Sequence, residues 1–446
     1  MSTQLPQKIH FVGIGGIGMS GLAEFLNKEG HTITGSDLEK SDLTQKLEKR
    51  GININYSHKK ENIKNTEMIV YSSAIPHDNP EIQTEQVPVI KRAEMLNRIM
   101  QKRKYSIAIS GMHGKTTVSS LLTHIFETAG LDPCALIGGI LQDKETNIRY
   151  GAGDVCIVEG DEYDQSFLSL YPSDIIVTNI EAEHLDCYES FEHIKSSFKK
   201  FASRIGPSGN LIVNYDNKNI RDVFSDFDNK ITFGFNAKAD YSVVDYIIKP
   251  EHTEFIVQHK NNEWVFEISL PGKHNIINAL ACITMSFCYD ISPDSIKKGL
   301  KTFPGIERRM EIRYRDNNYT LIDDYAHHPT EIKATLSSTN QKFNGRLIAV
   351  FQPHLYSRTK EFYQDFAEVL TAADTSYVTE IYPAREEPIP EVSSKLITEQ
   401  NRFLNFCSKN KIVDELLNII QPGDIIITLG AGDINQIHEE LIKKID

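Results

Sequence analysis

One short segment carries the clearest chemistry in the sequence. It follows an apolar run and precedes a stretch with helical spacing. Backbone N–H groups at a helix start attract anions, a lysine can reach the β- and γ-phosphates, and a threonine hydroxyl can bind Mg²⁺. The usual pattern has glycine where this chain has Ile109, but the strand–turn–helix context still predicts an ATP-type phosphate loop. Its residues are Gly111, Met112, His113, Gly114, Lys115, Thr116 and Thr117.

Acidic residues and a histidine follow two later strand-like runs. Val155–Glu159 ends in Glu159, and the run that ends at Asn179 is followed by His184. Ligands bind at the carboxyl ends of parallel strands, and Mg²⁺ prefers oxygen ligands. We therefore expect Thr116 and Glu159 to bind Mg²⁺, with a solvated acidic loop as the alternative for Glu159. His184 is a candidate for a second Mg²⁺, for orienting a substrate, or for a structural hydrogen bond.

A glycine-rich turn near the N-terminus indicates a second phosphate site. Residues 13–18 read Gly-Ile-Gly-Gly-Ile-Gly, with glycines at Gly13, Gly15, Gly16 and Gly18, and Asp37 follows the next strand-like run. On spacing alone this is a dinucleotide fingerprint with Asp37 on a ribose. The same geometry suits a UDP-sugar diphosphate, so a dehydrogenase and a UDP-sugar enzyme both stay open.

Alternating strand and helix patterns must position these groups. Three successive stretches show this alternation, which predicts parallel sheets. We expect an α/β protein of three domains: Rossmann-like over 1–104, a central P-loop ATPase-type domain over 105–311, and Rossmann-like over 312–446. Residues 210–270 contain several short β-like runs and are expected to add mostly antiparallel structure to the central domain.

Composition excludes several classes of protein. Net charge is −13, which argues against a general nucleic-acid surface. The six cysteines form no Cys-x-x-Cys pair, so neither a zinc site nor a disulfide framework is expected. The N-terminus lacks a signal-peptide core, and no apolar run is long enough for a membrane helix. We expect a cytoplasmic protein without membrane insertion.

Several segments together resemble the Mur ligase family across essentially the whole chain. They are His10–Gly21, the phosphate loop in the family's Gly-x-x-Gly-Lys-Thr form, Gly272–Ala279, Gly305–Arg309, Asp323–Pro329 and Phe351–Thr359. The last segment is typical of the branch that adds L-alanine. There the better-known form has arginine where this chain has Leu355.

The resemblance implies roles for further residues. It places Asn275 near adenine, Arg309 on the ATP phosphates and Asp324 at the ATP side. Asp37, Ser72 and Arg92 become neighbours of a UDP-sugar. Tyr325, His354 and Arg358 become the amino-acid site. Lys199 lies where several relatives carry a carbamylated lysine, but this branch lacks that feature, so no such role is assigned.

The implied reaction activates a carboxylate. ATP phosphorylates the lactyl carboxylate of UDP-N-acetylmuramic acid (UDP-MurNAc), and the amine of L-alanine displaces phosphate. The expected catalytic residues are Lys115, Glu159, His184 and Arg309, with two Mg²⁺ ions for which Mn²⁺ is an alternative. The remaining expectations are a monomer or homodimer and no nucleic-acid partner. A Mur ligase for another amino acid or peptide, an NAD-dependent oxidoreductase and a P-loop switch NTPase are the rival hypotheses.

Overall fold

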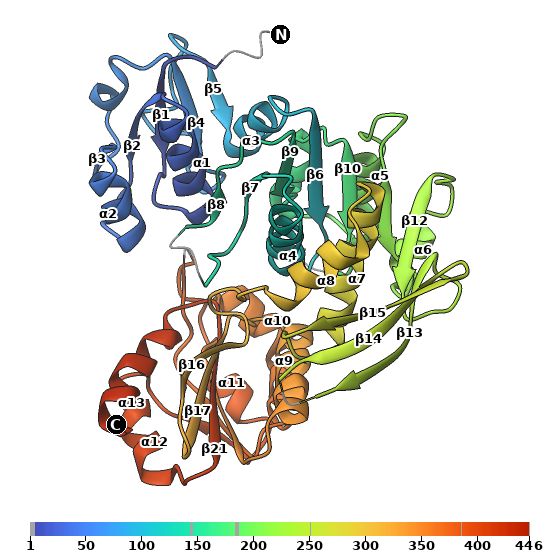
Figure 1. Cartoon of the computed structure of the whole chain (residues 1–446). Helices are drawn as coiled ribbons and strands as arrows, with labels where there is room; N and C mark the ends of the chain where they lie inside the picture. Colours follow the sequence, from blue (N-terminus) through green and yellow to red (C-terminus); the bar gives the residue numbers. More distant parts are fainter. Residues whose placement is uncertain (1–4, 143–145, 183–186, 250, 385, 446) are drawn as a thin grey trace. The chain divides into compact units, whose positions relative to one another are not determined.

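The computed structural model describes residues 5–142, 146–182, 187–249, 251–384 and 386–445. Its three β-sheets, each accompanied by helices, form the expected α/β protein (Figure 1). The chain divides into two compact units. The first comprises Met1–Asp245, Ile256–Phe266 and Ile277–Pro304, and the second comprises Tyr246–Phe255, Glu267–Ile276 and Gly305–Asp446. The boundaries 1–104, 105–311 and 312–446 stay a proposal.

The first sheet is parallel throughout, in the order β3-β2-β1-β4-β5. Because β1 lies between β2 and β4, the order reverses beside it, and such a switch point is where doubly wound sheets bind ligands. The glycine turn follows β1 directly, and the N-cap of α1, Gly16, makes no side-chain capping bond. The elements are β1 (Lys8–Val12), α1 (Ile17–Lys28), β2 (Thr32–Ser36), α2 (Asp42–Lys49), β3 (Asn53–Asn55), η1 (Lys60–Ile63), β4 (Met68–Tyr71), β5 (Val89–Lys91) and α3 (Arg92–Met100).

The second sheet has the order β15-β14-β13-β12-β11-β10-β6-β9-β7-β8. Its centre is parallel, and β6 lies between β10 and β9, so the loop after β6 sits at the middle of the carboxyl edge. The strands are β6 (Tyr105–Ser110), β7 (Cys134–Leu136), β8 (Ile148–Arg149), β9 (Val155–Glu159), β10 (Asp174–Val177), β11 (Leu211–Asn214), β12 (Lys230–Gly234), β13 (Tyr241–Ile248), β14 (Thr253–His259) and β15 (Asn262–Ile268). The helices are α4 (Lys115–Thr128), η2 (Tyr163–Ser169), α5 (Phe191–Ala202), α6 (Lys218–Val223), α7 (Lys273–Cys288) and α8 (Pro293–Lys301).

The prediction for residues 210–270 is partly wrong. β11 pairs in parallel with β10 and β12, and β12 pairs in parallel with β13. The short helix α6 supplies the crossover between β11 and β12, and its six residues left little helical pattern to detect. β13, β14 and β15 are neighbours joined by short turns, so they form hairpins, because parallel neighbours need much longer connections. Antiparallel structure is therefore confined to this end of the region.

Helix α7 is buried, as its apolar sequence predicts. Residues such as Ile276, Leu280 and Ile283 are fully buried. Beside it, α4 and α8 approach closely at Gly299, where an added Cβ would lie 2.9 Å from the Cα of Ile125. A larger residue there would push the helices apart. Among the described residues, no helix is both long and apolar enough to cross a membrane.

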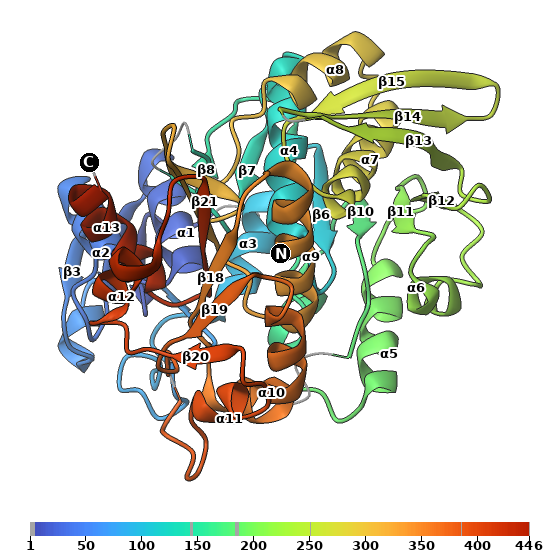
Figure 2. The same ribbon diagram turned by 90° about the horizontal axis from the view of Figure 1, so that it is seen from below.

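The third sheet has the order β16-β17-β21-β18-β19-β20; β16 pairs antiparallel with β17, and the other neighbouring strands pair in parallel. Alternate residues along its strands pack into two hydrophobic cores, one on each face, because successive side chains of a strand point to opposite faces. Ala349 packs with α9, α10 and α11 on one face, whereas Ile348 packs with α12 and α13 on the other (Figure 2). The elements are β16 (Glu311–Arg315), β17 (Tyr319–Asp324), α9 (Pro329–Lys342), β18 (Leu347–Phe351), α10 (Tyr356–Leu370), β19 (Thr375–Val378), α11 (Lys395–Thr398), β20 (Leu404–Phe406), α12 (Ile412–Ile419), β21 (Asp424–Leu429), η3 (Ile434–Gln436) and α13 (Ile437–Ile445).

Candidate active site

The phosphate loop requires glycine at two positions. Gly111 has a φ of 136° and Gly114, the N-cap of α4, has a φ of 84°. An added Cβ at Gly111 would lie 2.1 Å from Oγ1 of Thr178, and one at Gly114 would lie 2.7 Å from Oδ1 of Asn278. Both the backbone conformation and the lack of space therefore exclude a side chain. The loop that the sequence predicts is packed directly against neighbouring polar residues.

Two residues just after β10 hold this loop in place. Thr178 Oγ1 donates to the carbonyl of His113 at 2.6 Å. Asn179 accepts from His113 N at 2.9 Å and donates to its carbonyl at 2.9 Å. Both backbone groups of His113 are thus engaged, which fixes the turn before α4. Sequence reasoning missed Thr178 and Asn179, although the position of Asn179 at a strand end was a signal.

Lys115 is the cation at the start of α4. Its Nζ donates to Gly111 O at 2.5 Å, Met112 O at 3.1 Å and Glu162 Oε1 at 2.8 Å. Burial lowers the pKa of Lys115, but the charges of Glu162, Asp161 and Glu159 outweigh burial and hold it above its usual value. The ammonium group therefore stays charged beside the loop, as contact with phosphate requires.

Glu159 and Thr116 form a pair of oxygen donors. Thr116 Oγ1 donates to Glu159 Oε2 at 3.2 Å, while Oε1 accepts from Ser119 Oγ at 2.9 Å and Gly138 N at 2.6 Å. Burial raises the pKa of Glu159, against the lowering effects of these donors and Lys115. A carboxylate and a hydroxyl are hard donors that fit Mg²⁺, and a cation there would favour the ionised carboxylate.

The donor set agrees with a metal bound mainly through phosphate. In the described ranges no cluster of three or more His, Cys, Asp or Glu side chains suits a metal ion. Mg²⁺ at nucleotide sites commonly uses only one or two protein carboxylates and completes its shell with phosphate and water. His184, the third expected ligand, lies outside the described residues. Lys199 pairs with Asp226 at 2.9 Å, with nearly half of its side chain exposed.

The glycine turn after β1 is held by the end of β2. Gly13, with a φ of 78°, donates its N–H to Ser36 O at 2.9 Å. Gly15 donates to Asp37 Oδ2 at 2.8 Å, so this carboxylate binds the turn itself. Cβ atoms added at Gly13 and Gly15 would contact Ser72 and Asp37 at 3.4 and 2.8 Å. The expected UDP-sugar residues from three strands therefore meet at one edge.

Arg92 joins this turn to the acidic segment after β9. An added Cβ at Gly18 would lie 3.0 Å from Arg92 Nη1, and Arg92 Nη2 donates to Asp161 Oδ2 at 3.1 Å. The next residue, Glu162, binds Lys115. The first unit thus brings the two predicted phosphate loops into one chain of charged contacts.

Asp324 and its neighbours form a separate group in the second unit. Asp324 accepts from Met310 N at 2.7 Å and Ala326 N at 2.9 Å, and burial raises its pKa to about 6. The guanidinium carbon of Arg309 lies 5.3 Å from the Tyr325 ring centroid, and its Nη1 lies 3.9 Å from Glu331 Oε1. Asn275 donates to Pro271 O at 2.7 Å.

The expected amino-acid residues also come together in this unit. The ring centroids of Tyr325 and His327 are 5.4 Å apart, and those of His327 and His354 are 6.0 Å apart. Arg358 Nη1 lies 3.4 Å from His354 Nδ1. Burial lowers the pKa of His327 to about 4, so this ring is neutral near pH 7. His327 had no role in the sequence prediction, although it lies in the same motif as Tyr325.

Three protein-family models together match most of the chain. Residues 8–104 match "Mur ligase family, catalytic domain", residues 109–286 match "Mur ligase middle domain", and residues 308–432 match "Mur ligase, glutamate ligase domain". The chain belongs to the Mur ligase family.

Individual relatives agree with that assignment. The UDP-N-acetylmuramate–L-alanine ligases of Geotalea daltonii and Clostridium tetani are each 42% identical, over 98% of this chain and 98% of theirs. The crystal structure of UDP-N-acetylmuramate-alanine ligase from Thermotoga maritima is 27% identical, with a TM-score of 0.85 and 98% coverage of both chains. A murein peptide ligase from Psychrobacter arcticus is 25% identical, with a TM-score of 0.73 and 98% coverage of both chains.

Leu355, which stands where the better-known form has arginine, lies at the start of a helix in this Mur ligase. Leu355 is the N-cap of α10, with a φ of 73° and no side-chain capping bond. Its N–H donates to Tyr382 O at 3.0 Å. Arg358 lies one turn into the helix, beside His354. The second unit therefore offers Arg358 as a cation next to the two histidine rings.

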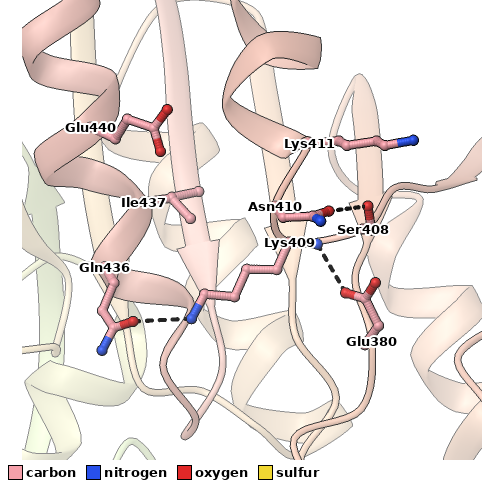
Figure 3. Close-up of a pocket in the computed structure, with 8 residues that line it drawn as sticks. All are labelled: Glu380, Ser408, Lys409, Asn410, Lys411, Gln436, Ile437 and Glu440. Carbon is pink, nitrogen blue, oxygen red and sulfur yellow. Dashed lines mark hydrogen bonds between the residues drawn. The ribbon is translucent and has the colours of Figure 1, made fainter.

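A hollow of about 570 Å³ in the second unit lies apart from these residues. Figure 3 shows Lys409 reaching Gln436 across it, and Lys409 Nζ also pairs with Asp433 at 2.6 Å. Lys409 is thus held by Gln436 and Asp433, and the lining includes none of the predicted site residues. It is lined by Glu380, Ser408, Lys409, Asn410, Lys411, Gln436, Ile437 and Glu440.

Proposed function

We propose that this Mur ligase is a UDP-N-acetylmuramate–L-alanine ligase of peptidoglycan precursor synthesis. It would use ATP to join L-alanine to the lactyl carboxylate of UDP-MurNAc, releasing ADP and phosphate. The observation that carries the proposal is whole-length similarity, at 42% identity, to relatives named for this reaction. The coexistence of a phosphate loop and a separate glycine turn supports it, because the reaction needs two phosphate-bearing substrates.

The proposed roles in the first unit follow from charge and hydrogen bonding. Backbone N–H groups of the Gly111–Thr117 loop and the ammonium of Lys115 would bind the ATP phosphates. Thr116 and Glu159, with His184, would hold Mg²⁺, which supplies charge neutralisation for the transferred phosphoryl group. The Gly13–Gly18 turn, Ser72 and Arg92 would bind the UDP portion of the other substrate. Asp37 would act by holding the turn.

Positioning is the main requirement of the first chemical step. A carboxylate is a poor acyl donor, so the γ-phosphoryl group must first pass to the lactyl oxygen. Phosphoryl transfer depends on alignment and charge neutralisation more than on covalent help from the protein. A lysine whose charge is secured by Glu162 suits this role, because it meets the phosphates without first having to gain a proton.

The second step requires an amine and the exclusion of water. In the proposal, Arg358 binds the amino-acid carboxylate, and Tyr325 and His354 line the pocket with His327. Asn275, Arg309 and Asp324 contribute on the ATP side. The amine attacks the acyl phosphate and phosphate leaves, while the new amide bond forms. The acyl phosphate must be kept from water until the amine attacks.

Phosphate release provides the test. Purified protein with ATP and Mg²⁺ should release phosphate only when UDP-MurNAc and L-alanine are both present. Dependence on neither substrate would overturn the ligase proposal, and hydride exchange with NAD would favour the oxidoreductase. A panel of L-alanine, L-serine and glycine tests the amino acid, since one methyl group is worth only about 1–3 kcal/mol. The state as monomer or homodimer and the absence of a nucleic-acid partner stay predictions.

A further inference from the structure

A buried carboxylate lies beside the glycine turn without belonging to the predicted site. Glu81 is fully buried in the segment between β4 and β5. Its Oε2 accepts from Ser36 Oγ at 2.5 Å and lies 3.0 Å from His58 Nδ1. Its Oε1 accepts from Lys59 N at 3.2 Å and from the side-chain amide of Asn62. Four separate groups thus converge on one side chain.

These contacts keep Glu81 ionised. Burial alone raises the pKa of Glu81, but its interactions with His10, Ser36, Asn62 and His58 lower it to about 2. His10 is itself buried on β1, with Nε2 3.8 Å from Oε2 of Glu81. Burying a carboxylate is unfavourable unless hydrogen bonds satisfy it, so its convergent donors fix both its charge and its orientation.

The contact with Ser36 links Glu81 to the glycine turn. Ser36 O accepts from the backbone N–H groups of Gly13 at 2.9 Å and Ile14 at 3.0 Å. The next residue, Asp37, accepts from Gly15 N at 2.8 Å. Three successive N–H groups of the turn are therefore held by Ser36 and Asp37. Glu81 in turn holds the Ser36 side chain.

The segment that carries Glu81 also carries Ser72 at its start. Ser72 donates its N–H to Val12 O at 3.2 Å and lies against Gly13. A single buried carboxylate therefore connects the end of β2 and residues 58–62, just before and within η1, with the segment that follows β4. Loss of its hydrogen bonds would release several parts of the turn together.

We propose that Glu81 is a positioning residue for the UDP-sugar site, acting through Ser36 to set the geometry of the Gly13–Gly18 turn. The inference rests on the proposed function. Glu81 does not touch the substrate in this proposal. Its loss weakens binding of the UDP portion because the turn that binds it loses its geometry. ATP binding at the other loop stays unchanged.

The decisive variant is Glu81→Gln, which keeps the shape but turns one acceptor into a donor. That donor would face groups that already donate to Glu81. We expect the dissociation constants of UDP and UDP-MurNAc, measured by calorimetry, to rise at least about tenfold, with the KM of ATP within about twofold. The matched control is Glu85→Gln, an exposed glutamate of the same segment, which should change neither.

Ser36→Ala tests the same inference by changing the other partner of the Ser36–Glu81 hydrogen bond. It removes the hydroxyl between Glu81 and the turn and should weaken UDP binding in the same direction. The double variant should be no weaker than Glu81→Gln alone, because both changes break one connection. If Glu81→Gln fails to fold, Ser36→Ala decides the question by the same binding measurements.

The outcomes separate the two proposals. If the wild-type protein binds neither UDP nor UDP-MurNAc, the proposed function fails. If the wild type binds them and neither variant changes their dissociation constants by more than about twofold, the inference about Glu81 is overturned. An equal rise in the KM of ATP would also overturn it, because that result indicates general structural damage.

Discussion

Replacing Lys115 by methionine tests the phosphate loop most directly. Lys115 and Glu162 form a 2.8 Å ion pair, with side chains only 17% and 2% exposed. Methionine keeps the apolar stem but removes the charge and leaves the Glu162 carboxylate without that cation. Removing one partner of a buried pair costs about 3–5 kcal/mol. We therefore expect the free energy of unfolding of the first unit to fall by about this amount.

The single tryptophan gives a local measure of this effect. Trp264 lies on β15 in the first unit, with its ring 4.9 Å from that of Phe287. Urea unfolding followed by its fluorescence should show the loss in Lys115→Met. The double variant Lys115→Met/Glu162→Gln should recover most of it, because the buried charge is gone. Lys200→Met, at an exposed lysine of α5, is the control.

Activity should respond differently from stability. Turnover should fall about 10²–10³-fold in both Lys115 variants, since removal of one electrostatic group at a reacting centre typically costs this much. UDP-MurNAc binding should stay within about twofold. A stability loss below about 1 kcal/mol without recovery in the double variant would refute the ion-pair reasoning. Recovery of turnover in the double variant would refute the role of Lys115.

Three further substitutions test the metal site, the phosphate loop and a buried histidine. Glu159→Gln should raise the Mg²⁺ concentration for half-maximal phosphate release about tenfold or more; an unchanged Mg²⁺ profile would contradict the metal role. Gly111→Ala should abolish ATP binding in calorimetry, because its Cβ would lie 2.1 Å from a neighbouring oxygen. The control is Gly51→Ala, at φ 85° with nothing within 4 Å of the added Cβ. It should lower the free energy of unfolding in urea by only about 1–2 kcal/mol and leave ATP binding unchanged. Burial lowers the pKa of His438 from 6.5 to about 4, so its stabilising contribution is complete above pH 6.5 and is lost as pH falls through 4. The stability difference between wild type and His438→Gln should shrink over that range in thermal unfolding, and a constant difference would exclude this linkage.

Local patterns predicted much of the fold and of the site. Gly111 and Glu159 lie at strand ends that short apolar runs mark, and Lys115 begins the helix after the loop, so their placement followed from strand–turn–helix rules. Thr178 and Asn278 were not predictable in this way, because they contact the loop from distant parts of the chain. Glu81 gave no signal either, since its hydrogen-bonding partners, Ser36 and three residues between 58 and 62, lie about 20 to 45 residues before it in the chain.

The parallel pairing of β11 and β12 was missed for a related reason. The connecting helix α6 is too short to show helical periodicity, so the region was predicted to be mostly antiparallel. The family resemblance supplied the substrate names, which no pattern of charge or spacing contains. Leu355 illustrates the limit of that resemblance, because its left-handed backbone and its contact with Tyr382 depend on this chain's own loop.

Asp161 and Glu162 are consecutive residues that pair with cations at the starts of two different helices, α3 and α4. Asp161 pairs with Arg92 beside the glycine turn, and Glu162 pairs with Lys115 of the phosphate loop. An insertion or deletion of one residue just before them would shift both partners at once. Chain length in this segment is therefore constrained together with the identity of the two acidic side chains, and protein engineers should place tags, linkers and loop grafts elsewhere.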